Sequence, residues 1–438
     1  MSGEFNIFDK TLEFTTRNHY VDVEDKVPIF LCSIGAHIFN TLNKCSRCDF
    51  DPNSPLVDAD IDFTIPNCPL RHNNMPFYTP MSQLPDTRIH IMIRGAKGSG
   101  KSILIQMFLA EGTGFLHSVN QDMGEGMKTM LGANSITEAG MFGSVDEEGN
   151  VLGRPIAREM CGGFLGFEEF SSMSDASKKE HSLDMKNQLL TSLDNGRVQK
   201  ALRAGWVNYT TRYTVWAGTQ PARFELESGL DRRFFIIDID MNPEKEREYK
   251  QAQHIQSNVS VEERTDLARL SLQIKQWLRE RMEYAVAHPP SGVMFGDDIL
   301  EWLEKPAVRS FEADLFRRIC IGYHMMRTTY VGGQPLVITL DDTLREILNQ
   351  SLEMRRTVMD ADLELIRSTF WMKDLPKSEV VKEVSRMVTN GDYQSAKRWI
   401  QENLEGQSWY AEFEPESKRR GRKGMLCRFG KNAAEDLG

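Results

Sequence analysis

The stretch Gly95-Ala96-Lys97-Gly98-Ser99-Gly100-Lys101-Ser102 decides the fold of this chain, because it fills every fixed position of the pattern G-x-x-x-x-G-K-[ST]. An apolar segment, 89–93, precedes the stretch, and a segment typical of a helix, 103–109, follows it. The glycines allow successive backbone N–H groups to turn toward a phosphate, and the positive end of the helix adds to the attraction. Lys101 would reach the β- and γ-phosphates of a nucleotide, and Ser102 would offer its hydroxyl to Mg²⁺. Strand, glycine-rich loop and helix together predict a nucleotide-binding α/β domain.

The composition predicts a globular protein of several domains. A chain of 438 residues is too long for one ordinary core, and 40% hydrophobic with 26% charged residues is typical of a folded chain, not a disordered one. No apolar run approaches the roughly 20 residues of a membrane helix, and the N-terminus lacks the pattern of a signal peptide. We therefore expect a cytoplasmic protein. The net charge of −10 means that any contact with DNA must come from local basic patches.

Two acids, Glu168 and Glu169, follow the apolar segment 163–167. Hydrolysis of ATP beside a phosphate loop requires one carboxylate that holds Mg²⁺ through its water shell and another that polarises the attacking water. We predict that Glu168 serves the metal and that Glu169 serves the water. The alternative is a pair of solvated acids at the end of a strand.

A third apolar segment, 213–218, is followed by Thr219 and Gln220, and an amide or hydroxyl at this strand tip could orient the same water. Farther along, Arg232 and Arg233 precede a further predicted strand, 236–240. Paired arginines at such a place are often surface charge. In a ring ATPase, however, an arginine before this strand projects into the neighbouring subunit's site and stabilises the charge that develops on the γ-phosphate.

Phosphate loop, acidic strand, polar strand tip and arginine follow one another in the order found in the AAA+ ATPases. Within that class the chain resembles the minichromosome maintenance (MCM) replicative helicases, over about residues 86–350. The segments that carry the resemblance are 88–95, 135–141, 145–150, 162–173, 196–205 and 337–342. Some positions differ from the MCM pattern. Thr219-Gln220-Pro221 stands where the family has Ala-Asn-Pro, and Leu230-Asp231-Arg232 stands where it has Leu-Ser-Arg. Residues 97–100 have the common phosphate-loop sequence instead of the MCM form.

This resemblance implies roles for several further residues. The segment 196–205 would form the hairpin that carries Lys200 and Arg203 to DNA in a central channel, although a basic residue buried in packing is the alternative. Arg317 would act as the sensor-2 arginine and, like Arg232 or Arg233, would come from the neighbouring subunit. Only about 85 residues precede the ATPase segment, too few for the N-terminal tier of the MCM proteins. A separate partner could supply that tier, or the ring could work without it.

The segment before the phosphate loop contains a possible zinc site. Its ligands would form a Cys₃His set: Cys45, Cys48, Cys68 and His72. The second pair, Cys68 and His72, is spaced more widely than in the common zinc knuckle. The alternative is free cysteines and a surface histidine in a loop. Three other cysteines lie in apolar contexts, and we expect them to be buried: Cys32, Cys161 and Cys320.

The last two hundred residues predict a helical region and then a small mixed domain. The segment 246–285 is strongly helical, with a break at 288–292 and an apolar stripe of Leu270, Leu272, Ile274 and Trp277. After about 360 come two helical stripes and two strand-like segments, 409–413 and 425–429. Between these strands lies a basic run: Lys418, Arg419, Arg420, Arg422 and Lys423. Helices followed by a hairpin with a basic tip predict a winged helix that grips DNA. A solubilising charged loop is the alternative.

These observations predict an α/β protein with an AAA+ core at 86–245, a helical lid at 246–360, a winged helix at 361–438 and an N-terminal segment at 1–85. By resemblance, ATP and Mg²⁺ would be its cofactors, with Zn²⁺ added if the cysteine cluster binds metal. It would form a homo-oligomeric ring, a hexamer, that acts as a helicase or translocase on single-stranded or forked DNA, with a loader as a further partner. One alternative is an AAA+ machine that remodels proteins. The other is a DNA-bound ATP switch, an initiator or regulator with little turnover.

Overall fold

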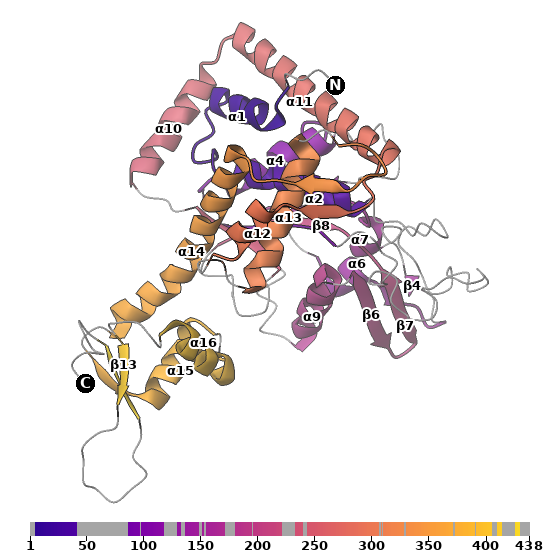
Figure 1. The fold of residues 1–438 in the computed structure, drawn as a ribbon. Coiled ribbons are helices and arrows are strands. Elements are labelled where there is room, and N and C mark those ends of the chain that lie inside the picture. Colours follow the sequence, from indigo (N-terminus) through magenta and orange to yellow (C-terminus); the bar gives the residue numbers. More distant parts are fainter. Residues whose placement is uncertain are drawn as a thin grey trace, which may run out of the picture. The chain divides into compact units, whose positions relative to one another are not determined.

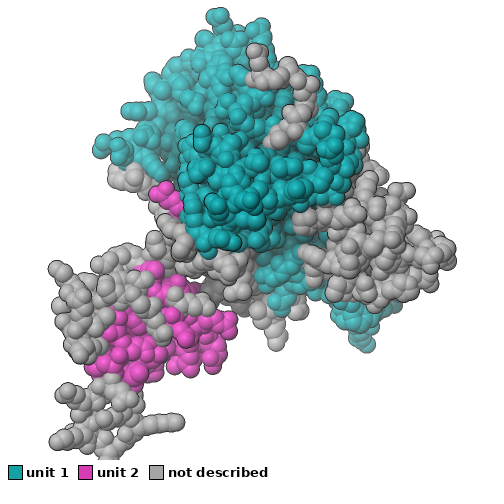
Figure 2. All heavy atoms as spheres, viewed as in Figure 1, with its two compact units in different colours: residues 1–224, 232–352 teal, residues 225–231, 353–438 magenta. Residues whose placement is uncertain are grey.

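The computed structural model describes residues 5–41, 86–96, 98–117, 129–132, 136–148, 151–152, 155–170, 180–194, 196–220, 233–239, 243–305, 308, 310–327, 330–370, 373–389, 391–404, 410–413 and 425–429. The chain divides into two compact units (Figure 2). Unit 1, in teal, consists of Met1–Phe224 and Arg232–Leu352; unit 2, in magenta, consists of Glu225–Asp231 and Glu353–Gly438. No helix among these described residues is long and apolar enough to span a membrane.

A five-stranded parallel sheet, flanked by helices, forms the centre of unit 1 (Figure 1). Its strand order is β2-β5-β8-β1-β9. The strands are β1 (His90–Gly95), β2 (Thr129–Leu131), β5 (Phe164–Phe167), β8 (Thr214–Thr219) and β9 (Phe234–Ile239). Every residue of β5 and β8 is buried. This continuous burial is typical of parallel strands with both faces covered, and it explains why the sequence shows apolar runs here and not alternation. The α/β expectation is confirmed at this level.

One face of the sheet is covered by two helices that meet at Trp216 of β8. The indole packs 4.8 Å from the ring of Phe30 on α2 (Val27–Thr41) and 5.6 Å from the ring of Phe108 on α4 (Lys101–Leu109). The indole N–H also donates a hydrogen bond to Ser33 Oγ, at 2.9 Å. Because both helices contact the same side chain, α2 and the phosphate-loop helix α4 lie on the same face.

Helix α2 also crosses α13 (Ser310–Arg327) at backbone contact. A Cβ added to Gly35 would lie 2.0 Å from the Gly322 carbonyl oxygen, and one added to Gly322 would lie 1.9 Å from the Cys32 carbonyl oxygen. Only glycine on both helices allows this approach. The described residues ahead of the phosphate loop, which include α1 (Ile7–Arg17), therefore pack within unit 1. The three cysteines expected to be buried are so: Cys32, Cys161 and Cys320.

The region predicted as a lid is helical. Its elements are α10 (Pro243–Ser257), α11 (Val261–Ala287), α12 (Asp297–Leu303), α13 and α14 (Asp342–Phe370), with a parallel pair of short strands, β10 (Val293–Phe295) and β11 (Leu336–Ile338). The single stretch expected at 246–285 is two helices, because Ser260 caps the start of α11 by accepting a hydrogen bond from the Glu263 N–H. Leu270 and Ile274 are buried as expected, but Leu272 is 64% exposed. Its inclusion in the apolar stripe was wrong, since the next positions on the Leu270 face are three and four residues on.

The described part of unit 2 contains the end of α14 from Glu353 onward, two further helices and a three-stranded antiparallel sheet of order β12-β14-β13. The elements are β12 (Asp374–Pro376), α15 (Lys377–Met387), α16 (Tyr393–Asn403), β13 (Tyr410–Phe413) and β14 (Leu426–Phe429). The two strand-like segments expected near the end of the chain are confirmed. The two predicted helical stripes meet in one core, in which Val380, Val384 and Ile400 are all buried.

Smaller elements complete unit 1. Two short helices and a pair of two-residue strands precede β5: α6 (Glu138–Phe142), β3 (Ser144–Val145), β4 (Val151–Leu152) and α7 (Ile156–Glu159). After β5 come α9 (Glu180–Asp194) and an antiparallel hairpin of β6 (Arg197–Leu202) and β7 (Gly205–Thr210). The hairpin expected at 196–205 is therefore present.

Candidate nucleotide site

The phosphate-loop sequence joins the carboxyl end of β1 to the first turn of α4. Gly98 and Gly100 have φ angles of 84° and 80°, in the left-handed region that residues with a Cβ rarely adopt. Gly100 is also the residue that precedes the first turn of α4. The loop can therefore turn back on itself and leave the N–H groups of the first helical turn facing outward, as a phosphate site requires.

Lys101 lies across its own loop and is 7% exposed. Its Nζ donates hydrogen bonds to the carbonyl oxygens of Gly95 and Ala96, both at 2.8 Å. Burial lowers the pKa of Lys101, and the nearby carboxylate of Glu169 offsets part of this effect. An ammonium group has three donors, so two of them fix the side chain against the loop. The result is a positive charge held in place at the start of α4.

The acidic pair and Gln220 meet at the same edge of the sheet. Glu168 and Glu169 follow β5, and Gln220 follows β8, which pairs with β5 in parallel register. The Gln220 amide, through Nε2, donates to Glu169 Oε2 at 3.2 Å. The other carboxylate oxygen, Oε1, is buried and has no hydrogen-bond partner among the described residues. The amide therefore orients one oxygen of Glu169 and leaves the other available to a water molecule.

Glu168 is held by a residue that sequence reasoning missed. Gln106, on the second turn of α4, donates a hydrogen bond from its amide to Glu168 Oε1. Gly218 allows the strand end to approach, because an added Cβ there would lie 2.6 Å from the Glu168 carbonyl oxygen. The metal-binding carboxylate expected from the sequence is thus tied to the helix that carries Ser102.

The residues at this edge fit a nucleotide with its Mg²⁺. Two buried hydroxyl oxygens, Ser99 Oγ and Thr219 Oγ1, lack hydrogen-bond partners among the described residues, as does Glu169 Oε1. A buried polar atom left unpaired costs about 1–3 kcal/mol, so three of them beside one ammonium group indicate a ligand site. The oxygen donors of Ser102 and Glu168 are those that Mg²⁺ prefers, and Mg²⁺ commonly takes only one or two protein ligands with phosphates.

Tyr249 of α10 closes the loop from outside, and nothing in the sequence indicated it. Its hydroxyl lies 3.0 Å from the Ser99 carbonyl oxygen and 3.3 Å from that of Val21. A Cβ on Gly100 would lie 2.7 Å from this hydroxyl, so a larger residue would displace the Tyr249 side chain as well as strain the positive φ angle. Burial, together with the negative charges of Asp22 and Glu24, raises the pKa of Tyr249 to about 12.

A bidentate ion pair braces the neighbouring strand ends. Arg94, the residue before Gly95, donates from Nε and Nη2 to the two carboxylate oxygens of Asp238, both at 2.6 Å. Arg94 and Asp238 are also directly paired in the register of β1 and β9. The base of the phosphate loop is therefore fixed to the adjacent strand.

The predicted arginines lie apart from these residues. Arg233 precedes β9, whose first residue pairs with His90, so it lies at the amino edge of the sheet. β1 has six residues, which separates this edge from the phosphate loop by about 20 Å. Arg233 forms an ion pair with Asp194 at the end of α9. Arg232 lies outside the described residues.

Arg317, the predicted sensor-2 residue, is exposed on α13 and makes no ion pair or hydrogen bond with the described residues. The adjacent Arg318 instead donates to the Arg88 carbonyl oxygen at 2.9 Å and to the carboxylate of Asp314 at 2.5 Å.

The two hairpin residues expected to contact DNA, Lys200 and Arg203, lie in different surroundings. Lys200 is an inward-facing residue whose Nζ lies 3.0 Å from Glu138 Oε1 and donates to the Gly143 carbonyl oxygen at 3.1 Å. Arg203 is exposed at the turn between the strands. Lys200 is therefore held by contacts within its own chain. The basic run at 418–423 and the four proposed zinc ligands at 45–72 lie outside the described residues.

No group of three or more His, Cys, Asp or Glu side chains that could hold a metal ion occurs in the parts of the chain that the structure describes.

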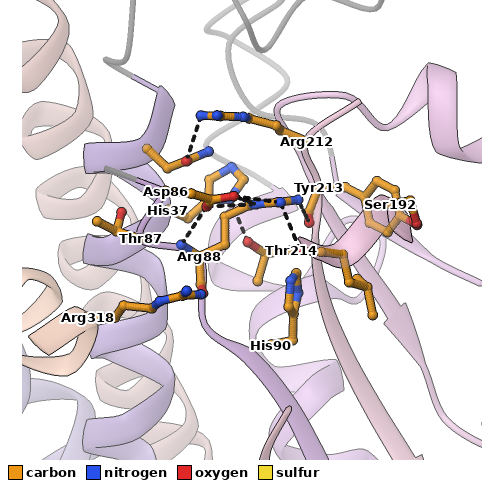
Figure 3. Close-up of polar contacts among 12 residues, drawn as sticks. His37, Asp86, Thr87, Arg88, His90, Ser192, Arg212, Tyr213, Thr214 and Arg318 are labelled. Atoms are coloured by element: carbon orange, nitrogen blue, oxygen red, sulfur yellow. Dashed lines mark hydrogen bonds and ion pairs between the residues drawn. The ribbon is translucent and has the colours of Figure 1, made fainter. Parts of the chain in front are cut away.

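A buried polar network lies at the opposite, amino edge of the sheet (Figure 3). The Arg88 guanidinium donates to the Asp86 carboxylate at 2.8–3.2 Å and to the carbonyl oxygens of Tyr213 and Leu193, both at 3.0 Å. Burial alone would raise the pKa of Asp86, but the surrounding arginines, with Arg88 foremost, hold it well below its ordinary value. These contacts join the start of β1 to β8 and α9, so they stabilise the sheet that carries the candidate nucleotide site.

His37 of α2 extends this network. One ring nitrogen, Nε2, lies 2.9 Å from the Gly162 carbonyl oxygen, and the other, Nδ1, lies 2.8 Å from the Thr214 hydroxyl. A carbonyl can only accept, so Nε2 carries the proton and Nδ1 accepts from the hydroxyl. Burial lowers the pKa of His37 to about 4.

Acid should therefore destabilise unit 1 before its carboxylates titrate. Between pH 6.5 and 4 the unfolded chain binds a proton at His37 that the folded chain does not, so stability falls as the pH falls. The loss between pH 7 and 5 is about 2 kcal/mol for His37 alone, and burial of His90 acts in the same direction. Between pH 7 and 5, Asp86 is largely ionised in both the folded and the unfolded chain. Urea unfolding at the two pH values should show a smaller loss for His37→Gln, whose amide can still donate to Gly162. An equal loss in both proteins would contradict this account.

No protein-family model matches the chain, and no curated protein matches it. The function is therefore inferred from the chemistry of the residues that meet at the carboxyl edge of the sheet.

Proposed function

We propose that this chain is a Mg²⁺-dependent AAA+ ATPase of MCM-like type, which forms a hexameric ring and moves along or unwinds DNA. The observation that carries the proposal is the meeting of Lys101, Glu169 and Gln220 at one edge of a parallel sheet. Ligands of such sheets bind outside the carboxyl ends of the strands, where neighbouring connections run in opposite directions. In this sheet the connections change direction at β1, which lies between β8 and β9.

Each residue at this edge has a distinct task in hydrolysis. The N–H groups of 98–102 and the Lys101 ammonium would bind the phosphates, and Ser102 and Glu168 would hold the metal. When bound, Mg²⁺ supplies neutralisation of the charge on the transferred phosphoryl group. Glu169 polarises the attacking water through its unpaired oxygen, and Gln220 keeps that carboxylate in one orientation. Gln106 does the same for Glu168.

The position of the arginine supports a ring. An arginine ahead of β9 lies about 20 Å from the phosphate loop of its own chain, too far for its side chain to reach. Arg233 can therefore act only on the site of a neighbouring subunit, Arg232 is the alternative one residue earlier in the sequence, and by the MCM resemblance Arg317 would also act across that interface. Turnover would then require assembly.

The arrangement of unit 2 supports DNA as the substrate. Two helices followed by a two-stranded hairpin, with a third strand beside it, are typical of a winged helix. Lys397 and Arg398 are exposed on α16, the second helix, and the basic run 418–423 lies between β13 and β14 in the sequence. Contacts of this kind read the phosphate backbone, so we expect little sequence preference.

Two alternative functions fit the described residues less well. A protein-remodelling ATPase would use the same nucleotide site, but the basic segments of unit 2 favour DNA over a polypeptide. An ATP switch that rarely hydrolyses would not need the Glu169–Gln220 pair, so that pair favours turnover.

The proposal predicts an ATPase that single-stranded DNA stimulates. The rate of phosphate release should rise on addition of an oligodeoxynucleotide at about 50 mM salt, and the stimulation should weaken markedly at about 200 mM, because phosphate contacts are lost as salt rises. A rate that ignores DNA at both salt concentrations would contradict the proposal. Stimulation by an unfolded polypeptide alone would favour the protein-remodelling function.

A further inference from the structure

The hairpin of β6 and β7 carries an exposed aromatic side chain that the nucleotide site does not use. Trp206, next to the turn, is 62% exposed. Its neighbour across the ladder is Ala201, which is also exposed and too small to cover the indole. Most tryptophans are largely buried in folded proteins, so an indole exposed to this extent beside a turn is a candidate contact surface.

The alternation of the two strands assigns this indole to the outer face. Side chains on a strand point alternately to opposite faces, and residues directly opposite each other share a face. Lys200 pairs with Val207, which is buried, so this pair belongs to the packed face. Trp206 and Ala201, one position away on each strand, therefore belong to the outer face. The exposed Gln199 lies farther along that face.

The base of the hairpin is held firmly. On the packed face, the Tyr209 hydroxyl donates to the Phe142 carbonyl oxygen at 3.1 Å, and Lys200 contacts Glu138. Along the edge, the Gln188 side chain of α9 donates to the Gln199 carbonyl oxygen at 2.7 Å and accepts from its N–H at 3.3 Å. The turn at Arg203 has no such ties to the rest of the described chain. Trp206 lies on β7, within the ladder that these contacts hold, so a ligand that contacts the indole would cost its backbone little conformational freedom.

We propose that Trp206 stacks on an unpaired base of single-stranded DNA while Arg203 contacts an adjacent phosphate. This inference rests on the proposed function and names the part of the substrate that the hairpin holds. Every base has a π-face, so stacking is sequence-tolerant, as a translocating enzyme requires. Bases in a duplex already stack on one another, and the indole therefore favours the single strand.

The surroundings of the indole favour a nucleic acid over a protein partner. Protein-docking surfaces gather several apolar side chains in one patch. Among the residues of α6, α9, β6 and β7 whose exposure the structure describes, Trp206 is the only exposed large hydrophobic side chain. A lone indole beside the exposed cation of Arg203 is instead the combination that grips a single strand, by stacking and by charge.

The test compares variants of the full chain on two DNA probes. Trp206→Leu keeps an apolar side chain but removes the aromatic face, and Trp206→Phe keeps a smaller face. The probes are oligodeoxythymidine and an abasic strand of equal length. Leu272→Ala, at a position of α11 that is 64% exposed, is the matched control. Trp206→Leu should bind oligodeoxythymidine about 5- to 150-fold more weakly, the effect of losing one stacked base. Trp206→Phe should lose less, and no variant should change binding to the abasic strand.

The outcomes separate this inference from the proposed function. If oligodeoxythymidine binds and stimulates the wild type but binds Trp206→Leu equally well, stacking is wrong and the ATPase proposal stands. Equal weakening on both probes also contradicts stacking, because the abasic strand offers no base. If the wild type ignores both strands, the DNA substrate itself is wrong and both proposals fall. ATPase activity without DNA should be the same in all variants, because β7 leads into the amino end of β8, whereas the phosphate loop follows the carboxyl end of the parallel strand β1.

Discussion

Alanine at the arginine that acts across the subunit interface should lower the rate of ATP hydrolysis about 10³- to 10⁵-fold and leave ATP binding intact. The candidates are Arg232 and Arg233, which precede β9. Their side chains would stabilise charge that appears only in the transition state, so the effect should fall on kcat. The variant at the other position should lose little. For Arg233, loss of the ion pair with Asp194 is worth no more than about 1 kcal/mol of stability.

Mixing tests whether the arginine acts in trans. Lys101→Ala subunits lack phosphate binding but keep their arginine, and the inactive arginine variant has the reverse defect. Mixed rings should regain activity, because some interfaces combine an intact loop with an intact arginine. Arg279→Ala, which removes an exposed arginine paired with Glu283 on α11, is the control and should behave as the wild type. Full activity of a monomer at every protein concentration would contradict the ring.

Glu169→Gln should reduce hydrolysis about 10²- to 10⁴-fold, the usual contribution of a general base. The substitution keeps the shape of the side chain and its contact with Gln220 but removes the charge that polarises water. ATP affinity should remain close to that of the wild type, whereas Lys101→Ala should weaken binding itself. Single-turnover hydrolysis and equilibrium nucleotide binding, measured on the same preparations, separate the two effects.

Glu159→Gln, at an exposed position on α7, is the surface control for Glu169→Gln. Hydrolysis by Glu169→Gln at the wild-type rate would show that the base has been misassigned.

Local patterns in the sequence were sufficient for the centre of the fold and most of the site. β1, α4, β5 and β8 are short apolar runs with a glycine-rich loop or an acidic or amide residue at their ends, and a parallel sheet brings such ends together. This is why Lys101, Glu169 and Gln220 could be named before their contacts were known. By contrast, Tyr249 reaches Ser99 only through the packing of α10, and no local pattern marks a contact across 150 residues.

Other features were missed although the sequence held a signal. The segment 27–41 is apolar on all sides, the pattern of a buried helix, yet its role as the partner of α13 depends on glycines in both helices. In the hairpin, a period of two places Lys200 on the same face as Val198 and leaves Trp206 on the other. The resemblance to the MCM hairpin pointed to the basic residues Lys200 and Arg203, and it gave no role to Trp206.

Strand separation is the measurement that tests the central claim most directly, namely that hydrolysis at this site drives movement on DNA. A forked duplex with a labelled strand should be unwound by the wild type in the presence of ATP and Mg²⁺. It should remain paired with Glu169→Gln, which still binds ATP. Efficient ATP hydrolysis by the wild type with no unwinding and no movement along single-stranded DNA would contradict the account.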